Sequence, residues 1–159
     1  MKFFGGRVIA LAALSLAGCA FNSSPADGLQ FKAPPDWRPS PGIMGFMQFW
    51  RPPADDRQML LLVRSPKTLQ PSDVFSDARL NDTLKNATVE KRQTIQICGN
   101  QPATYVAARG TSSRGGDDRV DLVMTNISGT TYFAMYVRPL EAAANPMAEA
   151  ALKELCAKS

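Results

Sequence analysis

Residues 88–138 constrain the fold most, because they form four consecutive strand-like segments separated by turn signals. Each segment is rich in β-branched, aromatic and aliphatic residues. Gly99-Asn100 and Ser128-Gly129 fit tight hairpin turns that need a positive φ. Residues 110–118 are expected to form a longer hydrophilic loop. It is either a recognition loop or a plain mobile connection, and the second interpretation is favoured. The pattern predicts an antiparallel meander. Its strands are expected at residues 88–97, 103–109, 119–127 and 130–138.

Further signals on both sides of the meander complete an α+β pattern. Pro71-Ser72, with Ser72 as N-cap, starts a helix over residues 74–87, and Asn145 followed by Pro146 starts a last helix. We therefore expect an antiparallel β-sheet of six or seven strands with a central helix and a C-terminal helix packed on it. The earlier strands are expected at residues 29–33, 44–50 and 59–64.

The last helix carries an apolar stripe that marks the face packed on the sheet. The stripe consists of Ala148, Ala151, Leu152, Leu155 and Cys156. Cys156 should therefore point at the sheet, within reach of a thiol at a strand end, and Cys98 lies at such an end. Simple alternation puts Cys98 on the face opposite Ile95 and Ile97. An irregular strand end, or helices on both faces of the sheet, would remove this conflict.

The N-terminal residues have the pattern of an export signal. Lys2 and Arg7 precede an apolar run, residues 8–17, which is too short to span a bilayer as a helix. The alternative to a lipoprotein signal is an ordinary signal peptide that ends in a cysteine by chance.

The end of the apolar run, Leu16-Ala17-Gly18-Cys19, resembles the lipobox of bacterial lipoproteins. The resemblance implies that a peptidase recognises Leu16, Ala17 and Gly18 and removes residues 1–18. Cys19 would then carry the covalent lipid, and three acyl chains would anchor the chain permanently in a membrane.

The same resemblance divides the chain into three parts. Residues 1–18 would be the signal peptide, residues 19–28 the lipidated N-terminus and a flexible tether, and residues 29–159 a single globular domain. Ala20 stands where an Asp retains Gram-negative lipoproteins at the inner membrane. It therefore favours the outer membrane over the inner one, with the domain facing the periplasm.

Lipidation of Cys19 would leave Cys98 and Cys156 as an even pair in an oxidising compartment. A disulfide between them is the expectation, and two buried thiols are the alternative. Zinc is not expected, because the chain has no histidine and neither cysteine belongs to a Cys-x-x-Cys spacing. No metal or other cofactor is predicted, since the adjacent Asp55 and Asp56 in a turn are read as solvated carboxylates.

The charge of the chain argues against nucleic acid as a partner. The formal net charge is +4 at pH 7, and removing Lys2 and Arg7 from the 18 basic residues leaves 16 against 14 acidic ones. Basic residues also alternate with acids, as around Arg114 and Arg119, so no stripe could follow a phosphate backbone.

Two short segments resemble the PsbP-like superfamily, which includes PsbP of photosystem II and bacterial envelope proteins of the DcrB type. Residues 29–37 read Leu-Gln-Phe-Lys-Ala-Pro-Pro-Asp-Trp, and residues 97–103 read Ile-Cys-Gly-Asn-Gln-Pro-Ala and lead into paired strands. The resemblance covers residues 28–158. It implies a binding or assembly role rather than catalysis, and it transfers no functional residue to this chain.

The residues present exclude the commonest hydrolases, so no catalytic residue is predicted. The absence of histidine removes Ser-His-Asp and Cys-His catalysis, and residues 19–159 contain no Ser-x-x-Lys. Gly115-Gly116 is followed by two acids that would repel a phosphate. Four other acids are not marked by spacing as more than surface or capping residues. These are Asp73, Asp77, Asp82 and Asp121.

Two hypotheses from different classes remain. The first is a non-enzymatic envelope lipoprotein that binds another envelope protein or supports its assembly. The second is a small-molecule-binding or enzyme-modulating lipoprotein, with an apolar pocket lined by aromatic residues that otherwise belong to an ordinary core. A deep pocket with converging polar groups favours the second, and a closed core with an exposed apolar patch favours the first. The aromatic residues are Trp37, Phe46, Trp50 and Tyr132.

Overall fold

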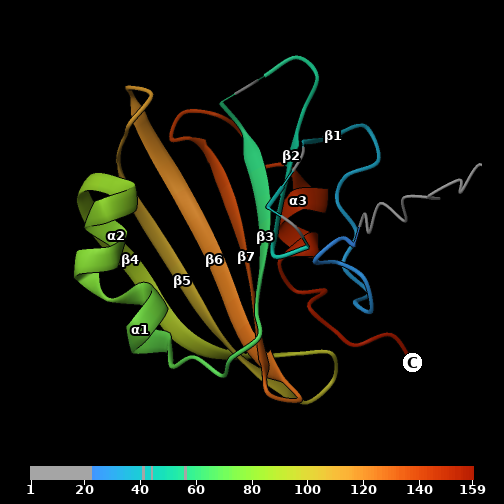
Figure 1. Cartoon of the computed structure of the whole chain (residues 1–159). Coiled ribbons are helices and arrows are strands. Elements are labelled where there is room, and N and C mark those ends of the chain that lie inside the picture. Colours follow the sequence, from blue (N-terminus) through green and yellow to red (C-terminus); the bar gives the residue numbers. More distant parts are fainter. Residues whose placement is uncertain (1–22, 41, 44, 56) are drawn as a thin grey trace, which may run out of the picture.

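One seven-stranded antiparallel sheet dominates the computed structural model, which describes residues 23–159 except 41, 44 and 56 (Figure 1). The last four strands form the predicted meander, and β3 pairs with β7. The α+β class and the strand number are therefore confirmed. Across the sheet the order is β1 (Arg38–Ser40), β2 (Met47–Arg51), β3 (Met59–Ser65), β7 (Thr130–Pro139), β6 (Asp117–Ile127), β5 (Gln101–Ser112) and β4 (Leu84–Ile97).

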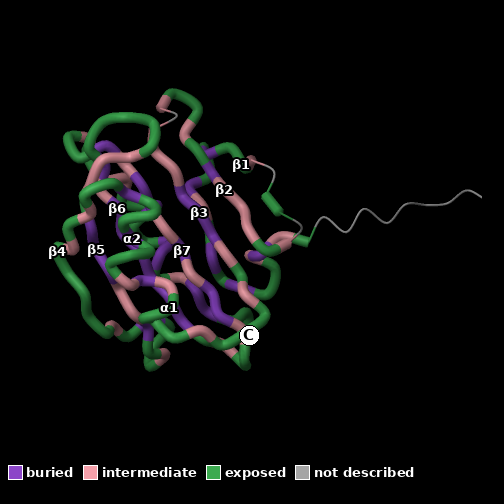
Figure 2. The backbone as a smooth tube through the Cα atoms, turned by 60° about the vertical axis from the view of Figure 1, so that its left-hand side comes forward, coloured by how far each residue is buried: buried purple, intermediate pink, exposed green. Residues whose placement is uncertain are grey.

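Helices lie on both faces of the sheet. Figure 1 shows α1 (Pro71–Phe75) and α2 (Asp77–Thr83) in front of β4 and β5, and α3 (Pro146–Ala151) behind the sheet beside the N-terminal segment. Alternate residues of each strand fill two separate cores, and Figure 2 shows the buried backbone concentrated in the central strands. In β6, for example, Leu122 packs under α1 and α2 whereas Val123 packs under α3.

The central helix predicted at residues 74–87 is in fact two shorter helices that end earlier. Ser76 has extended φ and ψ angles, and its hydroxyl caps α2 by accepting from the Arg79 amide. Gln70, not Ser72, caps α1. Leu84 is already extended and pairs with Ser112 of β5. Pairing with a neighbouring strand therefore overrides the local helix preference of residues 84–87.

The meander strands are longer than predicted, and the expected loop at residues 110–118 is mostly strand. Only residues 113–116 connect β5 to β6, with Gly115 and Gly116 both at positive φ. The strand predicted at residues 29–33 is reduced to one bridge between Leu29 and Ala157, because two prolines follow it.

The last helix begins as predicted. The Asn145 side chain accepts hydrogen bonds from the amides of Met147 and Ala148. The helix ends at Ala151, so Leu155 and Cys156 of the predicted stripe lie beyond it, although all five stripe residues are buried. Cys98 has a φ of 54° and lies beyond the end of β4, so strand alternation no longer sets its direction. The predicted disulfide between Cys98 and Cys156 is present, with the two Cα atoms 5.7 Å apart.

The packed domain includes residues that the sequence assigns to the tether. Pro25 is fully buried, and the Ser24 hydroxyl hydrogen-bonds to the Gln48 side chain. The Lys158 amide donates to the Gly28 carbonyl at 2.8 Å, so the first described segment pairs with the C-terminal one. The lipobox residues Leu16, Ala17, Gly18 and Cys19 lie outside the described residues.

Candidate functional site

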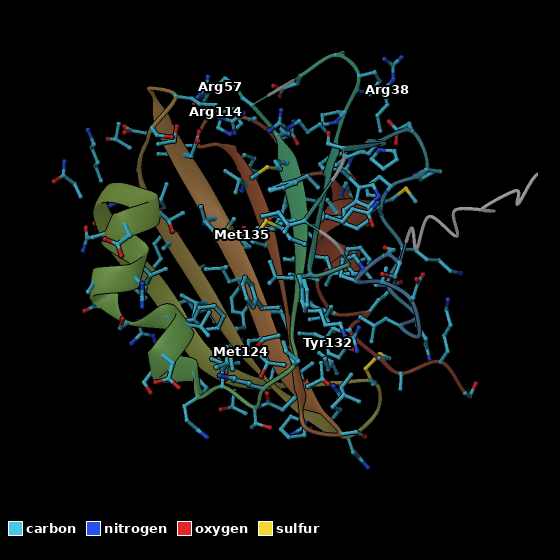
Figure 3. The ribbon with its side chains drawn as sticks, viewed as in Figure 1. Arg38, Arg57, Arg114, Met124, Tyr132 and Met135 are labelled. Carbon is cyan, nitrogen blue, oxygen red and sulfur yellow. A yellow bond between two sulfur atoms is a disulfide. The ribbon has the colours of Figure 1, made fainter. Side chains whose placement is uncertain are left out.

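Two concave surfaces lie on opposite faces of the sheet. We name the one beside α1 and α2 the α1–α2 groove, and the one beside α3 the α3 cavity. Figure 3 shows Met124 and Met135 on the side of α1 and α2, and Tyr132 on the side of α3. Because neighbouring residues of a strand point to opposite faces, the same strands supply the walls of both surfaces.

The α1–α2 groove has a volume of about 300 Å³ and an almost entirely apolar wall. It exists because the helical segment ends at Thr83 and covers β4 and β5, which leaves the same face of β7, β3 and β2 partly open (Figure 1). Leu61 and Leu122 form a buried floor. The half-buried side chains above this floor are Met47, Val63, Phe133 and Met135.

The chemistry of the groove suits an apolar group of variable shape. Met47 and Met135 have flexible, polarisable side chains that adapt to different partners. The charged residues at the rim, Arg79 and Asp82, form an exposed ion pair at 3.9 Å. The described lining residues therefore offer hydrophobic contact and no nucleophile with an adjacent base.

The α3 cavity is of similar size, about 330 Å³, but has a mixed wall. Ile95, Val123 and Leu152 supply the apolar part. Tyr105 and Asp121 form a polar end of this cavity. Further polar side chains that line it are Lys91, Gln93, Gln96, Glu149 and Lys153.

A buried carboxylate organises the polar end of the α3 cavity. The Tyr105 hydroxyl donates to Asp121 Oδ1 at 2.6 Å, and Arg119 donates to both carboxylate oxygens at 3.2 and 3.3 Å. Arg119 also donates to Glu90 at 2.7 Å. Only 5% of the Asp121 side chain is exposed, so these hydrogen bonds replace the water that a carboxylate otherwise binds.

This network shifts the pKa of two of its members, Tyr105 and Arg119. Burial, followed by the hydrogen bond to Asp121, raises the pKa of Tyr105 to about 12. The hydrogen bond to Asp121 is the main cause that raises the pKa of Arg119. At neutral pH the phenol therefore stays a donor and the guanidinium stays charged. Both Asp121 oxygens are engaged, so this carboxylate is not poised as a general base.

The sequence interpretation of Asp121 as a surface or capping residue is wrong. Its side chain is buried, and Ala107 of β5 and Tyr136 of β7 lie opposite it on the two neighbouring strands. The other three acids are as expected. Asp73 caps α1, Asp77 pairs with Arg92 at 3.2 Å, and Asp82 pairs with Arg79. The sequence signal that could have revealed this burial is the position of Asp121, which interrupts an apolar run in a central strand of the predicted meander.

The aromatic pocket of the second hypothesis is absent from the described part of the chain. Trp37, Trp50 and Tyr132 are all buried in the core beside α3. The Trp37 ring packs against Tyr136 with centroids 6.0 Å apart. Phe46, in contrast, is 47% exposed. The four residues therefore do not form one pocket, and both concave surfaces are lined by other residues.

The described residues contain no group of three or more side chains suited to hold a metal ion. Asp55 accepts from the Arg57 amide at 2.9 Å and from the Gln58 side chain at 3.1 Å, which is a turn-stabilising arrangement. Asp56 lies outside the described residues.

No protein-family model matches the sequence, and no curated protein matches it. Among solved structures, a Bacteroides thetaiotaomicron protein superposes with a TM-score of 0.58 at 17% identity, over 87% of this chain. This chain spans 48% of the length of that protein.

PsbP from the cyanobacterium Synechocystis sp. PCC 6803 superposes with a TM-score of 0.54 at 19% identity, over 75% of this chain and 79% of that one. The fold is PsbP-like. LpqN of Mycobacterium tuberculosis, which is involved in cell envelope biogenesis, superposes with a TM-score of 0.52 at 16% identity, over 79% of this chain and 80% of its own. At these identities the likeness establishes the PsbP-like fold and nothing about activity.

The helices of this PsbP-like domain are short. Within the described residues, none is long and apolar enough to cross a bilayer.

Proposed function

We propose that this chain is a non-enzymatic bacterial envelope lipoprotein that binds an apolar segment of another envelope component in the α1–α2 groove, as a binding or assembly factor. The groove carries this proposal. Monomeric proteins rarely leave contiguous apolar surface open unless it contacts something. Here Val63, Phe133 and Met135 line one face of adjacent strands beside α1 and α2, and all three side chains are only partly buried.

The proposed anchor is the lipid on Cys19, with the domain facing the periplasm and Ala20 directing the chain to the outer membrane. The export-signal pattern supports it, and so does the Cys98–Cys156 disulfide, since disulfides persist in oxidising compartments. The PsbP-like fold that the chain shares with LpqN, an envelope-biogenesis protein, is compatible with this setting.

A non-catalytic role is part of the proposal. The chain has no histidine, and the disulfide occupies both cysteines outside the lipobox. Asp121, the buried acid nearest to a cavity, is held in an ion pair with Arg119. These residues therefore serve binding or structure better than proton transfer.

Site-specific photo-crosslinking in living cells tests the groove. A benzophenone amino acid at Met135 should cross-link to a discrete envelope component, whereas the same probe at exposed Thr94 on β4 should not. Adding Val63→Asp, which places a charge in the half-exposed wall, should abolish the Met135 product. Equal cross-linking from both positions, or a product that survives Val63→Asp, would contradict the proposal.

The α3 cavity supports a second candidate function, the binding of a polar small molecule. Its polar end presents the protonated hydroxyl of Tyr105 next to an apolar wall, the combination by which small ligands are oriented. Native mass spectrometry of protein purified from its own cells should show a bound small molecule that Tyr105→Phe removes. Ligand-free protein in both samples would refute this second candidate.

A further inference from the structure

The described chain enters the domain at the loop between β1 and β2. The Ser23 hydroxyl lies directly over Gly45, where an added Cβ would be only 2.5 Å from it. The next residue, Ser24, is hydrogen-bonded to Gln48 at the start of β2. Residues 23 and 24 are thus held against this loop and do not extend away from the domain.

The same loop exposes two large apolar side chains. Ile43 is 63% exposed and Phe46 is 47% exposed. The Phe46 amide donates to the Ile43 carbonyl at 2.8 Å, so one turn holds both residues. Isolated exposed apolar residues need no explanation, but two in one turn beside the chain entry form a small apolar tip.

A basic residue, Arg64, lies beside this apolar tip, and two more lie at the end of the β1–β2 pair that is remote from the loop. The Arg64 amide donates to the Phe46 carbonyl at 2.7 Å, which places Arg64 next to the tip. Arg38 lies directly opposite Arg51 in the β1–β2 ladder (Figure 3 labels Arg38), an arrangement of like charges that costs stability. Within the described residues, none of these three arginines forms an ion pair with a carboxylate.

The length of chain before Ser23 limits how far this surface can be from the lipid. Four residue steps separate Cys19 from Ser23, and they span at most about 14 Å even when fully extended. A lipid on Cys19 would therefore hold the Ser23 end of the domain at the bilayer surface. The apolar tip lies in the same loop as Gly45, against which Ser23 packs, and is therefore close to this point of attachment.

We infer that Ile43 and Phe46 of the β1–β2 loop form a second membrane contact, in which both side chains enter the boundary between headgroups and acyl chains while Arg64 faces anionic phospholipid headgroups. This inference rests on the proposed lipid anchor at Cys19. It sets the orientation of the domain, with the β1 edge toward the bilayer and the β4 edge away from it, because β1 and β4 are the opposite edges of the sheet.

Depth-dependent quenching tests the contact on the lipidated full chain. An environment-sensitive fluorophore is attached to Ile43→Cys or, as a matched control, to Thr94→Cys on β4. The protein is then placed in phosphatidylcholine vesicles with or without phosphatidylglycerol, and brominated phospholipid serves as quencher. The Ile43 probe should be quenched, more strongly with phosphatidylglycerol, and the Thr94 probe should not. An unquenched Ile43 probe on vesicle-bound, lipidated protein overturns the inference and leaves the anchor intact.

A second arm uses the purified full chain with Cys19→Ser, so that failure of the anchor and failure of the loop contact are separable. Ile43→Asp with Phe46→Asp should weaken its binding to phosphatidylglycerol vesicles by roughly tenfold or more. Leu140→Asp with Met147→Asp changes two similarly exposed apolar residues elsewhere and should leave binding unchanged. Equal behaviour of the two double variants contradicts the inference. Absence of lipid on Cys19 in the mass spectrum of the wild-type chain contradicts the anchor instead.

Discussion

The Tyr105 hydroxyl and the Asp121 carboxylate are joined by a 2.6 Å hydrogen bond between neighbouring strands β5 and β6. Arg119 completes the arrangement from the same strand as Asp121. A carboxylate in the middle of a sheet is tolerated only when its charge and its lone pairs are satisfied. The three residues thus contribute to stability as one unit.

The unit predicts alkaline behaviour to which Tyr105 contributes. Its pKa is raised from 10.0 to about 12, so the stability linked to the protonated phenol is full below pH 10 and is lost as the pH rises toward 12. Ultraviolet titration of tyrosinate should show a late step that Tyr105→Phe reduces, and Tyr136, whose pKa burial also raises, should account for the remainder. Loss of a step near pH 10 in that variant would show that the phenol titrates normally.

Asp121→Asn should destabilise the domain. The amide keeps the shape but removes the charge that compensates Arg119, and we expect a loss of about 2 kcal/mol in the free energy of unfolding, measured with urea. Asp82→Asn is the matched control, because its ion pair with Arg79 is exposed and long. The control should change the free energy by less than about 0.5 kcal/mol. Equal effects in both variants would contradict a special role for the buried acid.

Removal of the disulfide should have a larger effect. Cys98 and Cys156 are separated by 58 positions, and loop-entropy reasoning gives about 4 kcal/mol as the upper stabilisation. Replacing both by Ser should lower the free energy of unfolding by up to that amount. Reduction of the wild-type chain should lower the free energy of unfolding by the same amount. A free energy of unfolding that does not change with reductant would contradict stabilisation by the disulfide.

The lipid anchor is tested by Cys19→Ser. The variant should appear in the soluble periplasmic fraction or remain unprocessed, because the proposed acylation site is gone. Fractionation and mass spectrometry distinguish these results from unchanged membrane retention, which would refute the lipoprotein assignment.

The sequence predicts the meander well, because alternation and turn residues are local signals. Ser128 and Gly129 both adopt the positive φ that a two-residue hairpin turn needs. It also places Asn145 correctly as a cap, since the capping hydrogen bonds span only three residues.

The concave surfaces were not predictable in the same way. The α1–α2 groove depends on where the helical segment ends, and that point is set when Leu84 pairs with Ser112, a partner far along the chain. The burial of Asp121 likewise depends on which face of β6 lies under α3. Both are set by tertiary contacts between segments far apart in the chain, and the local pattern of a single sequence does not contain those contacts.

The pairing of the two chain ends has a mechanical consequence. Leu29 bridges Ala157, and the Gln30 amide donates to the carbonyl of Cys156, which is covalently tied to the β4–β5 hairpin. A force that pulls on the proposed anchor would therefore act on the contact of Ser24 with Gln48 and then on this short pairing of the termini, from which it would pass through the disulfide into the hairpin. The domain would thus bear load at the membrane partly through a covalent cross-link.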